Sequence, residues 1–151
     1  MSDTENRTMA IHRTFNAPIQ MVWDAWARAE KIAQWWGPKG MQTKVIQHDF
    51  NANGIWKYVM TMPGGNEFVT EGVYSEIIVP EKIISSADFK PMTEGVEIQA
   101  LIEPNRDKTN IIFKVVHSTA EYCKQQEEMG FHKGWDSTFD RLNEYLEADL
   151  Q

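Results

Sequence analysis

Between residues 42 and 118 the sequence alternates apolar and polar side chains in short runs, and this constrains the fold more than any other feature. In one run Trp56, Tyr58 and Met60 fall on the same face, as expected of a strand with one buried side. The runs are separated by turns rich in glycine, proline and asparagine. With a shorter run near the N-terminus, they predict strands over residues 9–15, 42–50, 55–62, 67–78, 82–89, 96–103 and 110–118.

Helical periodicity follows the first of these strands. Pro18 suits the first position of a helix, because its missing N–H needs no partner there. One apolar stripe at helical spacing follows, formed by Ile19, Val22, Trp23 and Trp26. A second short helix is predicted at about residues 30–35, where Gly37 and Pro38 end it.

The last segment has the pattern of one long helix, from about residue 118 to residue 148. Ser118-Thr119-Ala120-Glu121 matches a capping box, in which the first and last side chains bond each other's backbone N–H groups. The apolar stripe of this helix consists of Tyr122, Met129, His132, Trp135, Phe139, Leu142 and Leu146. Gly130 and Gly134 lie inside it, each costing about 1 kcal/mol relative to alanine. Their spacing predicts a close approach of this helix to a sheet.

These elements predict an α+β fold with a curved antiparallel sheet of about seven strands, two short helices after the first strand, and a long C-terminal helix. With 151 residues, 42% of them hydrophobic, the chain suits one domain, which we assign to residues 9–148. Residues 1–8 are polar, and we expect a flexible N-terminus there. A sheet of this size twists and curls, so a helix across its concave side leaves a cavity.

The composition excludes several classes of partner. A net charge of −7 argues against nucleic acid or an anionic membrane, because phosphate contacts need clusters of Lys and Arg. No apolar run approaches the roughly 20 residues of a membrane span, so no membrane insertion is expected. Cys123 is the single cysteine, which rules out an internal disulfide and fits the reducing cytoplasm.

Six tryptophans and the inward strand faces indicate what lines the predicted cavity. Ligand pockets combine apolar walls with a few polar groups, and methionines adapt to varied shapes. The predicted ligand-binding residues are Trp36, Trp56, Tyr58, Met60, Phe68, Tyr74, Ile98, Phe113, His117, Met129, His132 and Trp135. The alternative is that these side chains pack against one another as a solid core.

A succession of short motifs carries a resemblance to a known family. The motifs are Arg13-Thr14-Phe15-Asn16-Ala17-Pro18, Val22-Trp23-Asp24-Ala25-Trp26, Gln34-Trp35-Trp36-Gly37-Pro38, Asp49 before Gly54-Ile55-Trp56, Gly72-Val73-Tyr74-Ser75-Glu76-Ile77, Pro80-Glu81-Lys82-Ile83, and Gly134-Trp135 with Arg141-Leu142. Across about residues 9–147 they resemble the START-like (SRPBCC) superfamily. Within it, they are similar to the family named after the C-terminal domain of the activator of Hsp90 ATPase.

The resemblance implies a helix-grip fold, in which the curved sheet surrounds the long C-terminal helix. The superfamily includes lipid carriers, hormone receptors, polyketide cyclases and self-sacrificing resistance proteins, so the fold does not imply one function. We expect first a protein that binds a small hydrophobic or amphipathic molecule, as a monomer or a homodimer. The alternatives are a cyclase- or hydratase-like enzyme and a factor associated with Hsp90.

An enzyme of this kind would need acid–base groups at the cavity. Glu128, His132 and Asp136 are spaced four residues apart and would share one stripe of the predicted long helix, where a histidine between carboxylates can transfer protons. His117 ends the last strand on the same face as Phe113 and is expected near the cavity mouth. The alternatives are a solvated row of charges on the helix and a structural role for His117.

No metal site and no cofactor are predicted. Cys123 and the four histidines show none of the short paired spacings of zinc ligands. The sequence also lacks the Lys-Ser/Thr of a phosphate-binding loop and the glycine fingerprint of a dinucleotide site. The histidines are His12, His48, His117 and His132.

Overall fold

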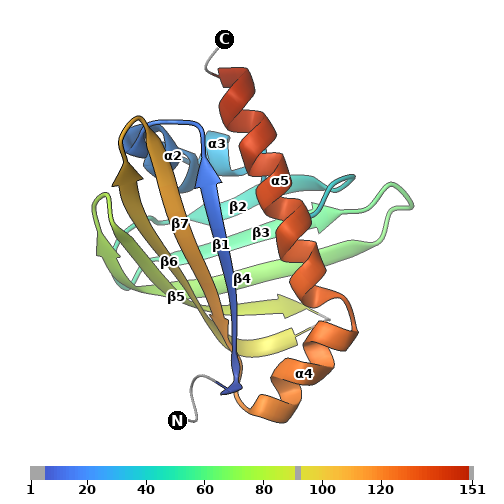
Figure 1. Ribbon diagram of the computed structural model, residues 1–151. Coiled ribbons are helices and arrows are strands. Elements are labelled where there is room, and N and C mark those ends of the chain that lie inside the picture. Colours follow the sequence, from blue (N-terminus) through green and yellow to red (C-terminus); the bar gives the residue numbers. More distant parts are fainter. Residues whose placement is uncertain (1–5, 91–92, 150–151) are drawn as a thin grey trace.

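The computed structural model describes residues 6–90 and 93–149, which contain seven strands and four helices (Figure 1). The strands are β1 (Thr8–Phe15), β2 (Gln42–His48), β3 (Ile55–Thr61), β4 (Glu67–Ile78), β5 (Lys82–Lys90), β6 (Thr93–Asn105) and β7 (Lys108–Val116). The helices are α2 (Ile19–Ala27), α3 (Ala29–Ile32), α4 (Ala120–Glu128) and α5 (Phe131–Asp149).

The strands form one antiparallel sheet in the order β1-β7-β6-β5-β4-β3-β2. The pairing shifts register between Val45 and Gln47 in β2, between Tyr74 and Glu76 in β4, and between Ala87 and Phe89 in β5. Such irregularities bend a strand and increase its twist. The sheet accordingly curls, and α5 lies across it, with α2 and α3 at one end (Figure 1).

The predicted α+β order, the antiparallel sheet and the long C-terminal helix are confirmed. The first strand begins one residue earlier than predicted, with Thr8 opposite Val116. Residues 1–5 of the predicted flexible N-terminus lie outside the described part of the chain, whereas Arg7 donates a hydrogen bond to the His117 carbonyl at 2.9 Å. No helix among the described residues is long and apolar enough to cross a membrane.

The predicted single helix over residues 118–148 is wrong, because the helix is interrupted at Gly130, between α4 and α5. This glycine has a φ of +89°, a left-handed conformation that favours glycine and commonly ends helices. The predicted capping box is also wrong. The N-cap is Thr119 rather than Ser118, and its Oγ1 accepts a hydrogen bond from the Tyr122 N–H at 3.0 Å.

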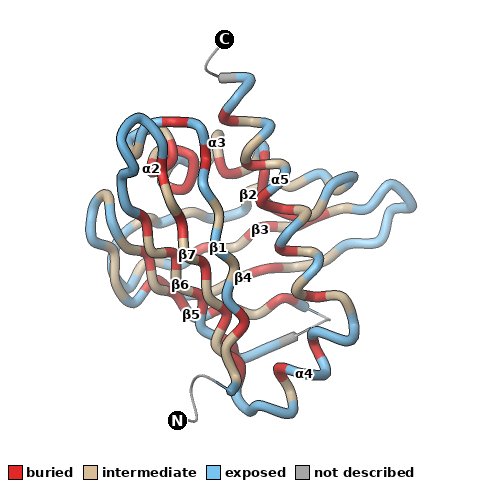
Figure 2. Tube along the Cα trace, in the orientation of Figure 1, coloured by how far each residue is buried: buried red, intermediate tan, exposed pale blue. Residues whose placement is uncertain are grey.

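Aromatic side chains fill most of the space between the sheet and the helices. The ring centroid of Trp135 lies 4.3 Å from that of Phe113, 5.2 Å from that of Trp36 and 5.7 Å from that of Phe89. Three buried indole N–H groups donate hydrogen bonds: Trp35 to the Ala25 carbonyl, Trp36 to Thr70 and Trp56 to Ser85. The buried Trp26 Nε1 has no partner among the described residues. Figure 2 shows buried residues alternating along the strands and lying on the inner side of α5.

A chain of hydrogen bonds ties β2, β3 and β4 to α2. His48 Nε2 lies 2.9 Å from the Ala27 carbonyl, which can only accept, so Nε2 carries the proton. His48 Nδ1 therefore accepts from the Tyr58 hydroxyl at 2.6 Å, and Tyr58 in turn bonds Tyr74. Burial lowers the pKa of His48 and raises the pKa values of both tyrosines, so all three are neutral at neutral pH.

Helix α5 contacts the loop that follows α3. The spacing of Gly130 and Gly134 had predicted a close approach of this helix to the sheet instead. A Cβ on Gly134 would lie 3.6 Å from Pro38 Cγ, an ordinary contact with that loop. The Arg141 guanidinium donates to four carbonyls there, those of Gln34 (3.1 Å), Trp36 (3.2 Å), Gly37 (2.9 Å) and Pro38 (3.2 Å). Carbonyls at and beyond a helix end lack helical partners, so this side chain supplies their hydrogen bonds.

We expect Arg141→Ala to lower the free energy of unfolding by about 1–2 kcal/mol, since charged donors to backbone carbonyls are lost and water replaces them only in part. The measurement is urea denaturation followed by circular dichroism. Glu147→Gln, an exposed change on the same helix, is the control and should leave stability unchanged. Equal stabilities for Arg141→Ala and the wild type would contradict the role assigned to the guanidinium.

We also expect stability to fall as the pH drops below about 6.5, because burial lowers the pKa of folded His48 below the ordinary value that the unfolded chain has. The unfolded state then binds a proton that the folded state does not, and the stabilisation is complete only above that pH. Urea denaturation at about pH 5 and about pH 7.5 measures the difference. His48→Gln should show a smaller difference than the wild type, and an equal one would contradict the assignment.

Candidate functional site

A cavity of about 180 Å³ lies where α5 begins, between that helix, the loop after α3 and the neighbouring strands. Three parts of the chain line it: the loop between α3 and β2 (Trp36, Gly37, Pro38, Met41), the strands (Met60, Phe68, Phe89), and the α4–α5 junction with α5 (Gly130, Phe131, Gly134, Trp135, Thr138). Met41 and Phe68 are half-buried, so the cavity reaches the surface at this end of the sheet.

The lining offers apolar contact and almost no hydrogen bonding. The Thr138 hydroxyl donates to the Gly134 carbonyl at 2.9 Å, and the Arg141 guanidinium occupies the loop carbonyls. No His, Asp, Glu, Lys or Arg stands among the described residues that line the cavity. The chemistry open to this site is therefore the burial of an uncharged, apolar group.

The cavity is small compared with typical ligand pockets, which measure roughly 300–1,000 Å³. A buried apolar cavity of about 150 Å³ binds benzene in another protein. The space here accordingly suits one aromatic ring or a short alkyl segment. A sterol or a long acyl chain would require the walls to move.

Four of the twelve predicted ligand-binding residues lie on the cavity wall: Trp36, Met60, Phe68 and Trp135. The other eight do not. Trp56, Tyr58 and Tyr74 pack against one another and are hydrogen-bonded further along the sheet, and Ile98 and Phe113 belong to the filled core. Met129 is 59% exposed at the break between the helices, because the helix that would have turned it inward ends before it.

The predicted acid–base stripe is wrong, because its members do not share one helix. Glu128 is the last residue of α4 and is exposed, whereas His132 and Asp136 belong to α5. The Asp136 carboxylate lies 3.6 Å from Arg13 in an exposed ion pair. Neither Glu128 nor either of the predicted catalytic histidines lines the cavity, and the expected place of His117 at its mouth is also wrong.

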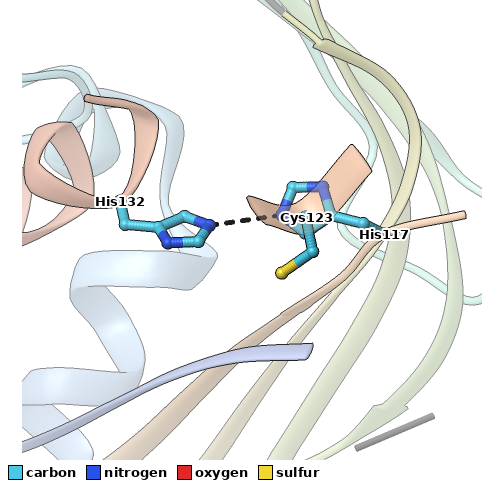
Figure 3. Close-up of side chains that lie close together, drawn as sticks. All are labelled: His117, Cys123 and His132. Atoms are coloured by element: carbon cyan, nitrogen blue, oxygen red, sulfur yellow. Dashed lines mark hydrogen bonds between the residues drawn. The ribbon is translucent and has the colours of Figure 1, made fainter. Parts of the chain in front are cut away.

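The two histidines meet in a separate cluster with the cysteine (Figure 3). His117 Nε2 and His132 Nε2 are 3.4 Å apart, and the donor atoms of His117, Cys123 and His132 all lie within 4.8 Å of one another. Burial and the neighbouring His132 lower the pKa of His117 to about 4, and burial lowers the pKa of His132. Sequence spacing did not predict this cluster, because its members come from the end of β7, from α4 and from α5.

Residues that the sequence analysis missed complete the cavity wall. Phe131 and Thr138 share helical spacing with the predicted Trp135, which could have placed them on the same face of α5 once its first residue was known. Phe89 shares the buried face of β5 with Ser85. Pro38 and Met41 carry no such signal, because a loop has no periodicity from which to read its inner side.

Comparison with known proteins places the chain in a family. A family model described as "Activator of Hsp90 ATPase homolog 1-like protein" matches residues 16–147. A search of curated proteins found no match.

The solved structures with a similar fold include a protein from Mycobacterium smegmatis, with 21% identity and a TM-score of 0.86 over 99% of this chain and 96% of that one. A protein from Nitrosomonas europaea is 25% identical, with a TM-score of 0.82 over 95% and 96% of the two chains. The AHSA1 protein from Silicibacter pomeroyi is 20% identical, with a TM-score of 0.75 over 94% and 99%. These likenesses agree with the helix-grip fold, and the family match covers most of the chain. This protein therefore belongs to the family of activator of Hsp90 ATPase homolog 1-like proteins.

Proposed function

We propose that this protein binds a small, uncharged, apolar molecule, or the apolar end of a larger amphipathic one, in the cavity at the start of α5. The single observation that carries the proposal is a cavity of about 180 Å³, bounded by apolar side chains, at the edge of the aromatic core. Native interiors contain few voids larger than a water molecule, so a space of this size at the surface end of a core favours an occupant.

The wall suits a planar or flexible apolar group. Trp36 and Trp135 meet edge to face at 89°, so their rings present two perpendicular surfaces at one corner. Met60 contributes a flexible thioether that adapts to the shape of a guest. An aromatic ring gains from such contacts beyond the area that it buries, by about 0.5–1.5 kcal/mol per favourable ring pair.

The alternatives are less well supported. A cyclase- or hydratase-like enzyme needs an acid or base within reach of the substrate, and the described cavity lining supplies none. A role with Hsp90, which the family's name suggests, would act through the surface of the protein. A rise in the ATPase rate of Hsp90 on adding this protein would support that role.

We propose a cytoplasmic location for the protein, because the free thiol of Cys123 stays reduced there.

Neutral aromatic compounds should stabilise the protein, whereas charged analogues of equal size should not, because the described lining has no partner for a charge. The probes are indole and naphthalene against benzoate and benzylamine. At a concentration of about 100 Kd, binding adds roughly 2.7 kcal/mol to the free energy of unfolding. The measurements are thermal denaturation and calorimetric titration. Stability unaffected by every neutral probe would contradict the proposal.

A larger side chain at position 134 in place of Gly134 should block ligand binding without unfolding the protein. Gly134→Met places a flexible apolar side chain at the wall, and we expect at least a tenfold loss of affinity for indole. Replacing a glycine inside a helix also stabilises it by about 0.5–1 kcal/mol, so the melting temperature should not fall. Lys133→Met introduces the same side chain at the preceding, exposed position and should keep full affinity for indole. Full affinity in Gly134→Met would place the ligand elsewhere.

A further inference from the structure

The cluster of His117, Cys123 and His132 lies outside the cavity and joins three separate elements (Figure 3). His117 directly follows β7, Cys123 lies in α4, and His132 is the second residue of α5. His117 is fully buried and Cys123 is only 8% exposed. Two imidazoles and a thiol thus converge at the joint where the two C-terminal helices meet the end of the sheet.

As a hydrogen bond alone, the contact between the two imidazoles is poor. Its nitrogens are 3.4 Å apart, beyond the usual range of about 2.7–3.2 Å, and one of the two must donate. The other ring nitrogen of His117, Nδ1, is buried and has no hydrogen-bond partner among the described residues.

The same distance fits two nitrogens on one metal ion. Nitrogens bound to zinc at about 2.0–2.1 Å in tetrahedral geometry stand roughly 3.4 Å apart, and a thiolate sulfur at about 2.3 Å lies slightly further from each. The three donor atoms here lie within 4.8 Å of one another, so only small side-chain rotations separate them from that geometry.

A fourth position faces solvent. A surface depression lined by Cys123, Glu127 and His132, among others, borders the cluster. Glu127 lies one helical turn after Cys123 in α4, and both residues line this depression together with His132. A carboxylate or a water can therefore complete four-coordination. One thiolate and one carboxylate would together neutralise a divalent ion.

We infer that His117, Cys123 and His132 form a binding site for a divalent transition-metal ion of the zinc class, with Glu127 or water as the fourth ligand. Two imidazoles and one thiolate are the donors that such borderline ions prefer, whereas magnesium and calcium prefer oxygen. Binding converts the Cys123 thiol to a thiolate and releases its proton to solvent. His117 and His132 each coordinate the ion through the lone pair of one ring nitrogen and release no proton.

Such an ion would link β7, α4 and α5 at the point where the chain reverses through Gly130. Phe131, which lines the cavity, directly precedes the ligand His132. Metal binding is therefore expected to raise the melting temperature of the full chain and to order the end of the cavity. This inference does not depend on the proposed function, because metal binding is measured without any apolar ligand.

The test is a titration of the chelator-treated, reduced full chain with Co²⁺, a spectroscopic substitute for zinc. One equivalent should give the visible bands of four-coordinate Co²⁺ and a near-ultraviolet sulfur-to-metal charge-transfer band, and Zn²⁺ should displace it. Calorimetry with Zn²⁺ should show one site. Absence of stoichiometric binding, or a Co²⁺ spectrum without the sulfur band, would overturn the inference.

Conservative variants assign the ligands. Cys123→Ser should abolish the sulfur band, and Cys123→Ser and His132→Gln should each weaken Zn²⁺ binding by at least about tenfold. His12→Gln, at an exposed histidine of β1, is the matched control and should bind Zn²⁺ as the wild type does. Circular dichroism without metal checks that each variant is folded. Wild-type affinity in a folded Cys123→Ser or His132→Gln would overturn the site.

Discussion

The contact of Trp135 with the aromatic side chains of the sheet and the loop organises this structure. Its ring meets Phe113 of β7, Phe89 of β5 and Trp36 of the loop after α3, so one residue of α5 is packed against three other segments. Burial of so much apolar surface is the dominant favourable term in folding. It sets the position of α5 on the sheet, and with it the wall of the cavity.

The cavity exists because this packing stops short of the start of α5. The aromatic core is dense around Trp135 and Phe139, whereas the end near Gly130 has small residues on the helix side and the half-buried Met41 and Phe68 opposite. Arg141 holds the loop that closes the third side. The same break at Gly130 turns α4 toward the end of β7, where it brings Cys123 to His117 and His132. One glycine thus shapes both sites.

Much of the fold could be predicted from local patterns. The alternation around Trp56 and Tyr58 placed both on the buried face of β3, and the helical stripe containing Trp23 and Trp26 predicted α2. The helix break was not predicted, because Gly130 is tolerated inside a helix as well as at its end, and apolar periodicity continues across it. The error displaced Met129 and Glu128 from the positions expected of them.

The sequence by itself determined which side chains face inward, because the alternation of a strand and the stripe of a helix are local properties of the backbone. Tertiary structure alone decided which of the inward residues meet a cavity and which meet one another. Tyr58 and Met60 share a face of β3, yet the first is hydrogen-bonded to His48 and the second lines the cavity. The physical reason is that the curvature of the sheet and the placement of α5 depend on contacts between residues distant in the chain. For the same reason, His117, Cys123 and His132 form a cluster that no spacing in the sequence reveals.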